Sequence, residues 1–212
     1  TVSIQQPTAS ALVGMSAVQV TGQATDPHLA SVAVNGVVAS LSGSGVRTWV
    51  AAQVPLPEGE STLVATASDR AGNLATASRV VERDSQSPTL TITDPAAGSV
   101  VPDAAVAVSG AVGEPNLDRV TVQGSTAEVQ GGAFSATVTL VEGDNTLIAR
   151  GTDRLRHGAE GARLVRCRAT APGLEITAPD EGSRIAAESV AGSGTITDET
   201  GATATVTGVD AT

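Results

Sequence analysis

The chain has 212 residues, with 12 basic and 22 acidic side chains, and its formal net charge is −10. This acidic excess disfavours binding to nucleic acid and to anionic membrane surfaces, and no apolar run approaches the ~20 residues that cross a bilayer. Only 1% of the residues are aromatic, which predicts a light, aliphatic core. The single cysteine, Cys167, cannot form an internal disulfide, and it alternates with arginines, so we expect a small buried strand residue rather than a reactive thiol.

Short alternating segments separated by turn residues run along the first part of the chain. They predict strands at residues 2–5, 18–24, 30–34, 37–41, 48–54, 61–68 and 75–82. Asn35-Gly36 predicts a hairpin, because both residues tolerate positive φ. Helical periodicity is missing throughout, so the fold is expected to be all-β.

The same plan then repeats. Val18-Gln-Val-Thr-Gly22 returns as Val106-Ala-Val-Ser-Gly110, and Glu58-Gly59 returns as Glu142-Gly143 after a slightly shorter interval. The first copy is therefore the longer one between these two motifs, and we place its extra residues in the loop at 39–45. Strands of the second copy are expected at 90–93, 105–112, 118–123, 126–129, 133–140, 145–152 and 162–169.

A third copy begins at Leu174-Glu-Ile176 and has markers at Gly194 and Val206. The predicted domains are module 1 at 1–86, module 2 at 87–171 and a partial module 3 at 172–212. Seven short antiparallel strands in each full copy indicate tandem immunoglobulin-like (Ig-like) β-sandwiches, with the third repeat incomplete. Half a sandwich would expose apolar faces and strand edges, so we expect strands from another chain, or a longer array, to complete it.

Several motifs resemble bacterial Ig-like tandem repeats, close to the glucodextranase domain B type. They are Leu90-Thr-Ile-Thr-Asp-Pro-Ala-Ala-Gly98, Val18-Gln-Val-Thr-Gly22, Val32-Ala-Val-Asn-Gly36, Glu142-Gly-Asp-Asn145 and Ala67-Ser-Asp-Arg-Ala-Gly-Asn73. The resemblance implies a secreted or surface-exposed, non-catalytic module, and it carries no binding residues. Module 2 departs from it at Asp153-Arg-Leu-Arg-His157, where we expect a longer basic loop that faces something different.

Asp69, Asn73 and Asp84 are the candidate ligands of a calcium ion that would stiffen the joint between modules, since calcium needs six or more oxygens. The competing interpretation is turn chemistry, in which Asp69 and Asn73 bond their own backbone beside a glycine. No dense Asp-x-Asp run is present, so the turn is favoured and no metal or cofactor is predicted.

Trp49 has two interpretations. If it corresponds to Phe134 it is a core residue, which requires a bulge near Pro55-Leu-Pro57. A strict alignment of Glu58-Gly59 with Glu142-Gly143 instead places it outward, where it could stack on a sugar ring. The core interpretation is favoured.

No set of residues predicts catalysis. His28 and His157 lie in loops of different modules without partners at zinc or triad spacing, so both are expected to be solvated. Glu58 and Glu60 recur as Glu142 and Asp144 at the same tight turn, and are expected to be solvated turn residues rather than the paired carboxylates of a glycosidase.

The sequence thus favours a spacer or adhesion stalk of a larger bacterial surface or secreted protein, either as a mature chain or as a fragment. Its expected partners are neighbouring modules, a protein or glycan that the residues do not identify, and other copies through the incomplete third module. One alternative is an accessory carbohydrate-binding module of a polysaccharide-degrading enzyme, suggested by the glucodextranase-like pattern and by an exposed Trp49. The other is a subunit of an extracellular filament.

Overall fold

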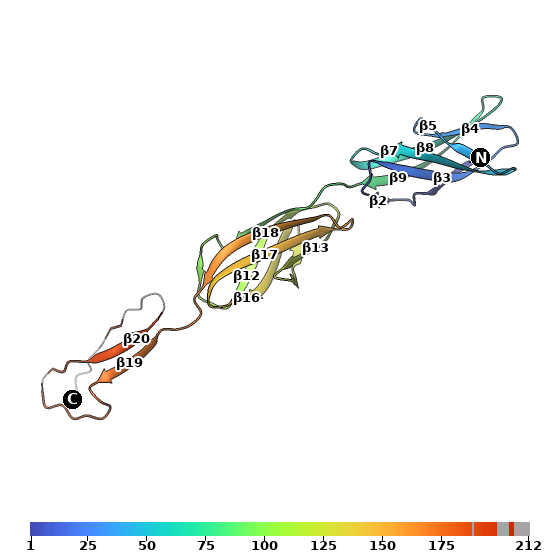
Figure 1. The fold of residues 1–212 in the computed structure, drawn as a ribbon. Coiled ribbons are helices and arrows are strands. Elements are labelled where there is room, and N and C mark those ends of the chain that lie inside the picture. Colours follow the sequence, from blue (N-terminus) through green and yellow to red (C-terminus); the bar gives the residue numbers. More distant parts are fainter. Residues whose placement is uncertain (188, 199–203, 206–212) are drawn as a thin grey trace.

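The computed structural model describes residues 1–187, 189–198 and 204–205. In these ranges the regular structure is all β, and the elements follow one another in an extended row from the N-terminal module to a small C-terminal hairpin (Figure 1). The all-β, tandem Ig-like prediction is confirmed. No helix in the described residues is long and apolar enough to cross a membrane.

The first module is a sandwich of two sheets. One has the strand order β1-β3-β7-β6 and the other β2-β9-β8-β4-β5, which is the ABED and GFC arrangement of an Ig-like fold. Its strands are β1 (Val2–Gln6), β2 (Ala11–Val13), β3 (Ala17–Thr25), β4 (Leu29–Val34), β5 (Val37–Val38), β6 (Ser40–Ser42), β7 (Val46–Pro55), β8 (Gly59–Asp69) and β9 (Leu74–Arg83).

The second module repeats this topology, with sheets β10-β12-β16-β15 and β11-β18-β17-β13-β14. Its strands are β10 (Thr89–Asp94), β11 (Val100–Val101), β12 (Ala105–Gly113), β13 (Leu117–Val122), β14 (Ser125–Thr126), β15 (Glu128–Gln130), β16 (Ala133–Thr139), β17 (Gly143–Asp153) and β18 (Gly158–Cys167). Each module buries a core of its own.

Two features of the sandwich were not predicted from alternation. The short strands β2 and β11 pair in parallel with β9 and β18, and they are too short to show a period. The strand expected at 37–41 is two strands: β5 pairs with β4, and β6 pairs with β7 in the opposite sheet. Between them Ala39 is buried and its N–H donates to the Val32 carbonyl (2.8 Å), so the chain steps across the sandwich there. The Asn35-Gly36 hairpin is present, with φ of 44° and 86°.

An aromatic side chain lies over a glycine at the same place in both cores. Trp49 is fully buried and pairs across the sheet with Gly22, and Phe134 pairs with Gly110 in the same way. A Cβ on either glycine would come closer than 3.0 Å both to a backbone carbonyl of the neighbouring strand and to the aromatic ring. The glycine of the repeated Val-x-Val-x-Gly motif thus makes room for the ring.

The extra residues of the first module are divided between two places. Most of them lie in the turn between Ser42 and Thr48, which is longer than the corresponding turn of module 2 between Gln130 and Ala133. The remainder is a bulge in β7 that shifts the register opposite β3, with Gln53 at a φ of 57°. The bulge was expected near Pro55-Leu-Pro57; it lies earlier because Ala51 and Val54 must both point into the core.

An arginine of the last strand holds the first strand in each module. Arg79 donates to the carbonyls of Ile4 (2.7 Å) and Pro7 (2.9 Å). Arg163, at the corresponding place in module 2, donates to the carbonyls of Ile92, Thr93 and Pro95. These bonds connect the ends of β1 and β10, which belong to one sheet of each module, to β9 and β18, which belong to the other sheet.

The third copy is represented by the hairpin of β19 (Gly173–Ala178) and β20 (Ser193–Thr197). Ile176 pairs with Gly194 in the register in which Ile4 pairs with Gly22. Among the described residues its apolar side chains stay exposed, Leu174 at 63% and Ile176 at 67%. Val206, the other predicted marker, lies outside the described residues.

Candidate functional site at the joint between the modules

A glutamate at the turn before β8 holds the linker that leaves the first module. Glu58 accepts hydrogen bonds from the backbone N–H and the hydroxyl of Ser85, both at 2.8 Å, and it lies 3.4 Å from the Arg83 guanidinium. The bonds from Ser85, and then the charge of Arg83, lower the pKa of Glu58. Glu58 is exposed at its turn, as predicted, and it also holds the linker, which the sequence did not indicate.

Glu142 does the same at the end of the second module. One of its carboxylate oxygens accepts from the N–H of Ala169 (3.0 Å) and from the N–H and hydroxyl of Thr170 (3.2 and 3.1 Å). Asp144 instead lies 3.7 Å from Arg166 across the strand pair, and Glu60 faces Glu82 in the strand register. Glu58 and Glu142 are thus a repeated linker clamp.

The opposite end of each module carries a compact turn between its last two strands. In module 1, Asp69 accepts from the N–H groups of Ala71 and Asn73 (2.8 Å each) and from the Asn73 amide (2.7 Å). In module 2, Asp153 accepts from the N–H of His157 (2.8 Å) and lies 2.7 Å from its Nδ1. The two turns have the same length, so the prediction of a longer loop in module 2 is wrong, and His157 simply occupies the place of Asn73.

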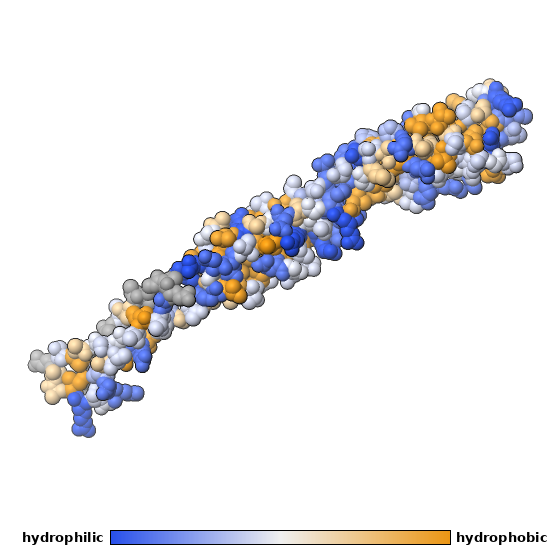
Figure 2. Space-filling view, in the orientation of Figure 1, coloured by the Kyte–Doolittle hydropathy of each residue, from blue (hydrophilic) through white to orange (hydrophobic). Residues whose placement is uncertain are grey.

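The turn of module 2 meets the linker from module 1. Asp84 is 6% exposed, and it accepts from the Asn116 amide (3.1 Å), which also donates to Glu82 (2.9 Å). A Cβ built on Gly14 of module 1 would lie 3.6 Å from Leu155 and 3.9 Å from the His157 ring. The two modules are therefore in contact, and Figure 2 shows hydrophilic residues gathered around this junction.

This geometry separates the residues of the predicted calcium site. Asp69 and Asn73 lie at the far end of β8, whereas Asp84 follows Arg83, which pairs with Gly59 at the start of that strand. A strand rises ~3.3 Å per residue, so the length of β8 places them roughly 30 Å apart. The turn interpretation of Asp69 and Asn73 is confirmed, and the three residues do not form one site.

Asp84 instead lies beside two residues that the sequence did not connect with it. One potential ligand atom from each of Asp84, Asp153 and His157 lies within 4.8 Å of the other two. His157 is half-buried, so the prediction of a solvated histidine is wrong; His28 is exposed, as predicted. The sequence does contain a signal for this role of His157. It aligns with Asn73, and each of the two follows the corresponding aspartate, Asp153 or Asp69, by four residues. The third group beside the Asp153–His157 pair is a carboxylate, so this cluster lacks the nucleophile of a hydrolytic triad.

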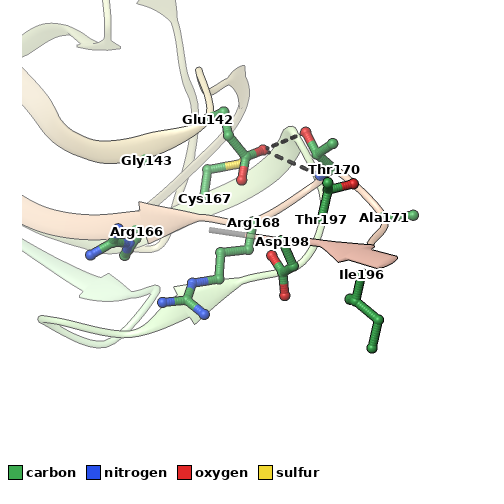
Figure 3. A pocket seen from close by; sticks show the side chains of 10 residues that line it. All are labelled: Glu142, Gly143, Arg166, Cys167, Arg168, Thr170, Ala171, Ile196, Thr197 and Asp198. Atoms are coloured by element: carbon green, nitrogen blue, oxygen red, sulfur yellow. Dashed lines mark hydrogen bonds between the residues drawn. The ribbon is translucent and has the colours of Figure 1, made fainter. Parts of the chain in front are cut away.

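A second junction follows the linker clamp of module 2. A cavity of about 520 Å³ lies between this clamp and β20. Figure 3 shows Glu142 bonded to Thr170, with Thr197, Asp198 and the arginines at 166 and 168 nearby. The cavity is a gap between the second module and the hairpin of the third copy, and it is lined by residues of both.

The remaining predicted residues are core residues. Trp49 is fully buried, which confirms the core interpretation and removes it as a platform for sugar stacking. Cys167 is a free, fully buried cysteine at the end of β18, as expected for a small apolar strand residue.

Acid is expected to weaken the turn of module 1. Hydrogen bonds from the side chain and the backbone of Asn73 lower the pKa of Asp69 below its ordinary 3.8. A lowered pKa stabilises the folded state above the unfolded pKa, and this contribution is lost as the pH falls through the folded value. Asp69→Asn should therefore lower the melting temperature of module 1 at pH 7, and the difference from wild type should shrink below about pH 4. Thermal melts followed by Trp49 emission test this; a difference that does not change with pH would contradict it.

Comparisons with known proteins agree with the fold. Residues 88–166 match the model of the family "Glucodextranase, domain B". A stretch of 103 residues, 48% of the chain, is 36% identical to Bacillopeptidase F of Bacillus subtilis (strain 168), and spans 7% of that protein.

Among solved structures, a three-Ig tandem of titin is 9% identical, with 78% of this chain and 65% of that chain covered and a TM-score of 0.51. The fibronectin(III)-like modules of Clostridium thermocellum CbhA are 14% identical, with 79% and 95% covered and a TM-score of 0.38. The second module therefore matches the family model of glucodextranase domain B over residues 88–166, and it lies within a tandem array of Ig-like modules.

Proposed function

We propose that this chain is a non-catalytic spacer or adhesion stalk within a larger secreted or cell-surface protein. The observation that carries the proposal is the repeated linker clamp. Glu58 holds Ser85, and Glu142 holds Ala169 and Thr170 at the same place in the next module. A linker fixed to the module that it leaves directs the next module along a defined axis.

The receiving side of the joint supports the same function. Asn116 of module 2 donates to both Glu82 and Asp84 of module 1, and Gly14 faces Leu155 and His157. Each module also has its own core, so force along the chain passes from one folded unit to the next through these joints. Such quasi-one-dimensional stacking sets a distance between the parts at either end.

A carbohydrate-binding role has lost one of the two observations that suggested it, because Trp49 is part of the core. Of the described aromatic side chains, Phe134 is buried as well, so stacking on a sugar has no aromatic platform here. The apolar side chains of β19 and β20 are exposed, which would allow another copy to pack there. The experiment below therefore also distinguishes a stalk from a filament subunit.

Small-angle scattering with multi-angle light scattering on residues 1–212 tests the stalk. The wild type should be a monomeric rod at two protein concentrations. Glu58→Ala should broaden the distribution of shapes, because Ser85 loses both of its acceptors. The matched control is Glu128→Ala, which removes the same charge from an exposed position on β15, away from the linker between modules 1 and 2, and should leave the curve unchanged.

Two outcomes would contradict the proposal. If the wild-type scattering fits modules that are freely jointed, the joint is not rigid and the stalk proposal fails. Growth of mass with concentration would instead support assembly through the third copy, and the chain would then be a filament subunit.

A further inference from the structure

We propose that the joint between the first two modules binds one divalent transition-metal ion, with Zn²⁺ as its representative, through Asp84, Asp153 and His157. Asp84 comes from the linker of module 1, and the other two come from the β17–β18 turn of module 2. The site stands on these side chains, and does not depend on the stalk function.

The charges of the cluster call for a cation. Asp84 is 6% exposed and Asp153 is 1% exposed, and buried charges in proteins are normally paired or bound to a metal. Within the described part of the chain, no arginine forms an ion pair with either carboxylate. From the residues that the structure describes, Asp84 receives an amide N–H from Asn116 (3.1 Å) and a backbone N–H from Gln86 (3.2 Å). In the described structure the one ion-pair partner that Asp153 has is the His157 imidazole, at 2.7 Å. A single imidazole balances at most one of the two carboxylates, so at least one negative charge is left for a cation to balance.

The positions of the three side chains suit coordination. One potential ligand atom from each lies within 4.8 Å of the others, so small rotations bring all three to the ~2.0–2.2 Å bonds of a zinc site. Asp153 is already oriented by the N–H of His157 (2.8 Å), and Asp84 is oriented by Asn116. Ligands held by second hydrogen bonds in this way are typical of metal sites.

The ligand set selects the class of metal. One imidazole nitrogen and two carboxylate oxygens suit zinc and related first-row ions. Calcium takes six to eight oxygens, and this cluster offers a nitrogen in place of one of them. Because the ligands come from two modules, the bound ion would join linker and turn and stiffen the joint.

The first module provides a natural comparison. Its equivalent turn has Asn73 in place of His157, and the Asn73 amide bonds Asp69 at 2.7 Å, the distance between His157 and Asp153. An asparagine therefore maintains this turn without an imidazole. His157→Asn removes the metal ligand while keeping the bond that shapes the turn.

Isothermal titration of the tag-free chain with ZnCl₂ at neutral pH tests the proposal. Wild type should bind one equivalent, and His157→Asn and Asp84→Asn should each weaken binding tenfold or more. His28→Asn removes the other histidine and should leave the affinity unchanged. Asn73→His places an imidazole beside Asp69, far from Asp84, and should add no second site. Melting of each variant, followed by circular dichroism, confirms that both modules are folded.

The results separate this site from the stalk function. The metal proposal is overturned if wild type binds no Zn²⁺, if His157→Asn binds as tightly as wild type, or if His28→Asn loses as much affinity. It is also overturned if calcium binds the joint as tightly as zinc. Scattering in chelator tests the stalk alone, and the expected effect of zinc is a narrower distribution of shapes in wild type but not in His157→Asn.

Discussion

Replacing Gly110 by alanine is expected to destabilise the second module by about 3 kcal/mol or more. The new Cβ would lie closer than 3.0 Å to the Thr91 carbonyl oxygen and to the Phe134 ring, and neither a paired strand nor a buried ring can move away freely. The melting temperature of this module should fall by roughly 12 °C or more. Circular dichroism during thermal unfolding measures the change.

Two internal references make this measurement specific. Trp49 is the single tryptophan and lies in the first module, so its emission should report an unchanged transition there. Gly158→Ala is the matched control in the second module, because the nearest atoms to its Cβ would be at 3.6 and 3.8 Å; we expect it to be neutral or stabilising by up to ~1 kcal/mol. An equal loss of stability in Gly110→Ala and Gly158→Ala would show that the ring does not require the glycine.

Trp49→Ala is expected to destabilise the first module by about 3–5 kcal/mol, because it leaves a large cavity in a core of small aliphatic residues. Trp49→Phe should cost only about 1–2 kcal/mol, since Phe134 fills the corresponding place over Gly110 in module 2. The indole Nε1 is buried without a hydrogen-bond partner in the described structure, so phenylalanine also removes an unsatisfied donor.

Urea unfolding followed by circular dichroism checks this pair of variants, with the second module as an internal reference. The test is whether Trp49→Ala lowers the free energy of unfolding of the first module more than Trp49→Phe does. If phenylalanine costs as much as alanine, the two aromatic residues do not occupy equivalent places, and the alignment of Trp49 with Phe134 fails. A loss of stability in the second module would show that the two cores are coupled through the joint.

At the joint between the modules, the spacing of the repeats predicts which residues correspond but not which residues are in contact. The repeat aligned Glu58 with Glu142, and this correspondence holds in the structure. Spacing alone did not show that Glu58 reaches Ser85, because this contact depends on how the last strand returns beside the turn. Nor did it show that Asp84 meets His157, since they come from different modules.

The sequence by itself determined the repeat, the all-β class and the strand pattern. These depend on local properties: alternation toward one buried face, and turns such as Asn35-Gly36 whose backbone needs residues that accept positive φ. It also placed Cys167 inside, because that position alternates with arginines, and it favoured a buried Trp49 through its correspondence with Phe134.

Only the tertiary structure decided which ends of the modules meet. The residues of the predicted calcium site, Asp69 and Asp84, are close in sequence, yet β9 carries the chain from one end of the sandwich to the other and separates them. The same traverse brings Asp84 to the β17–β18 turn of the next module, although Asp153 and His157 are far from it along the chain. Residues at the two ends of an extended strand are close in sequence but far apart in space. The site at the joint therefore depends on where β9 ends, and no local sequence pattern indicates it.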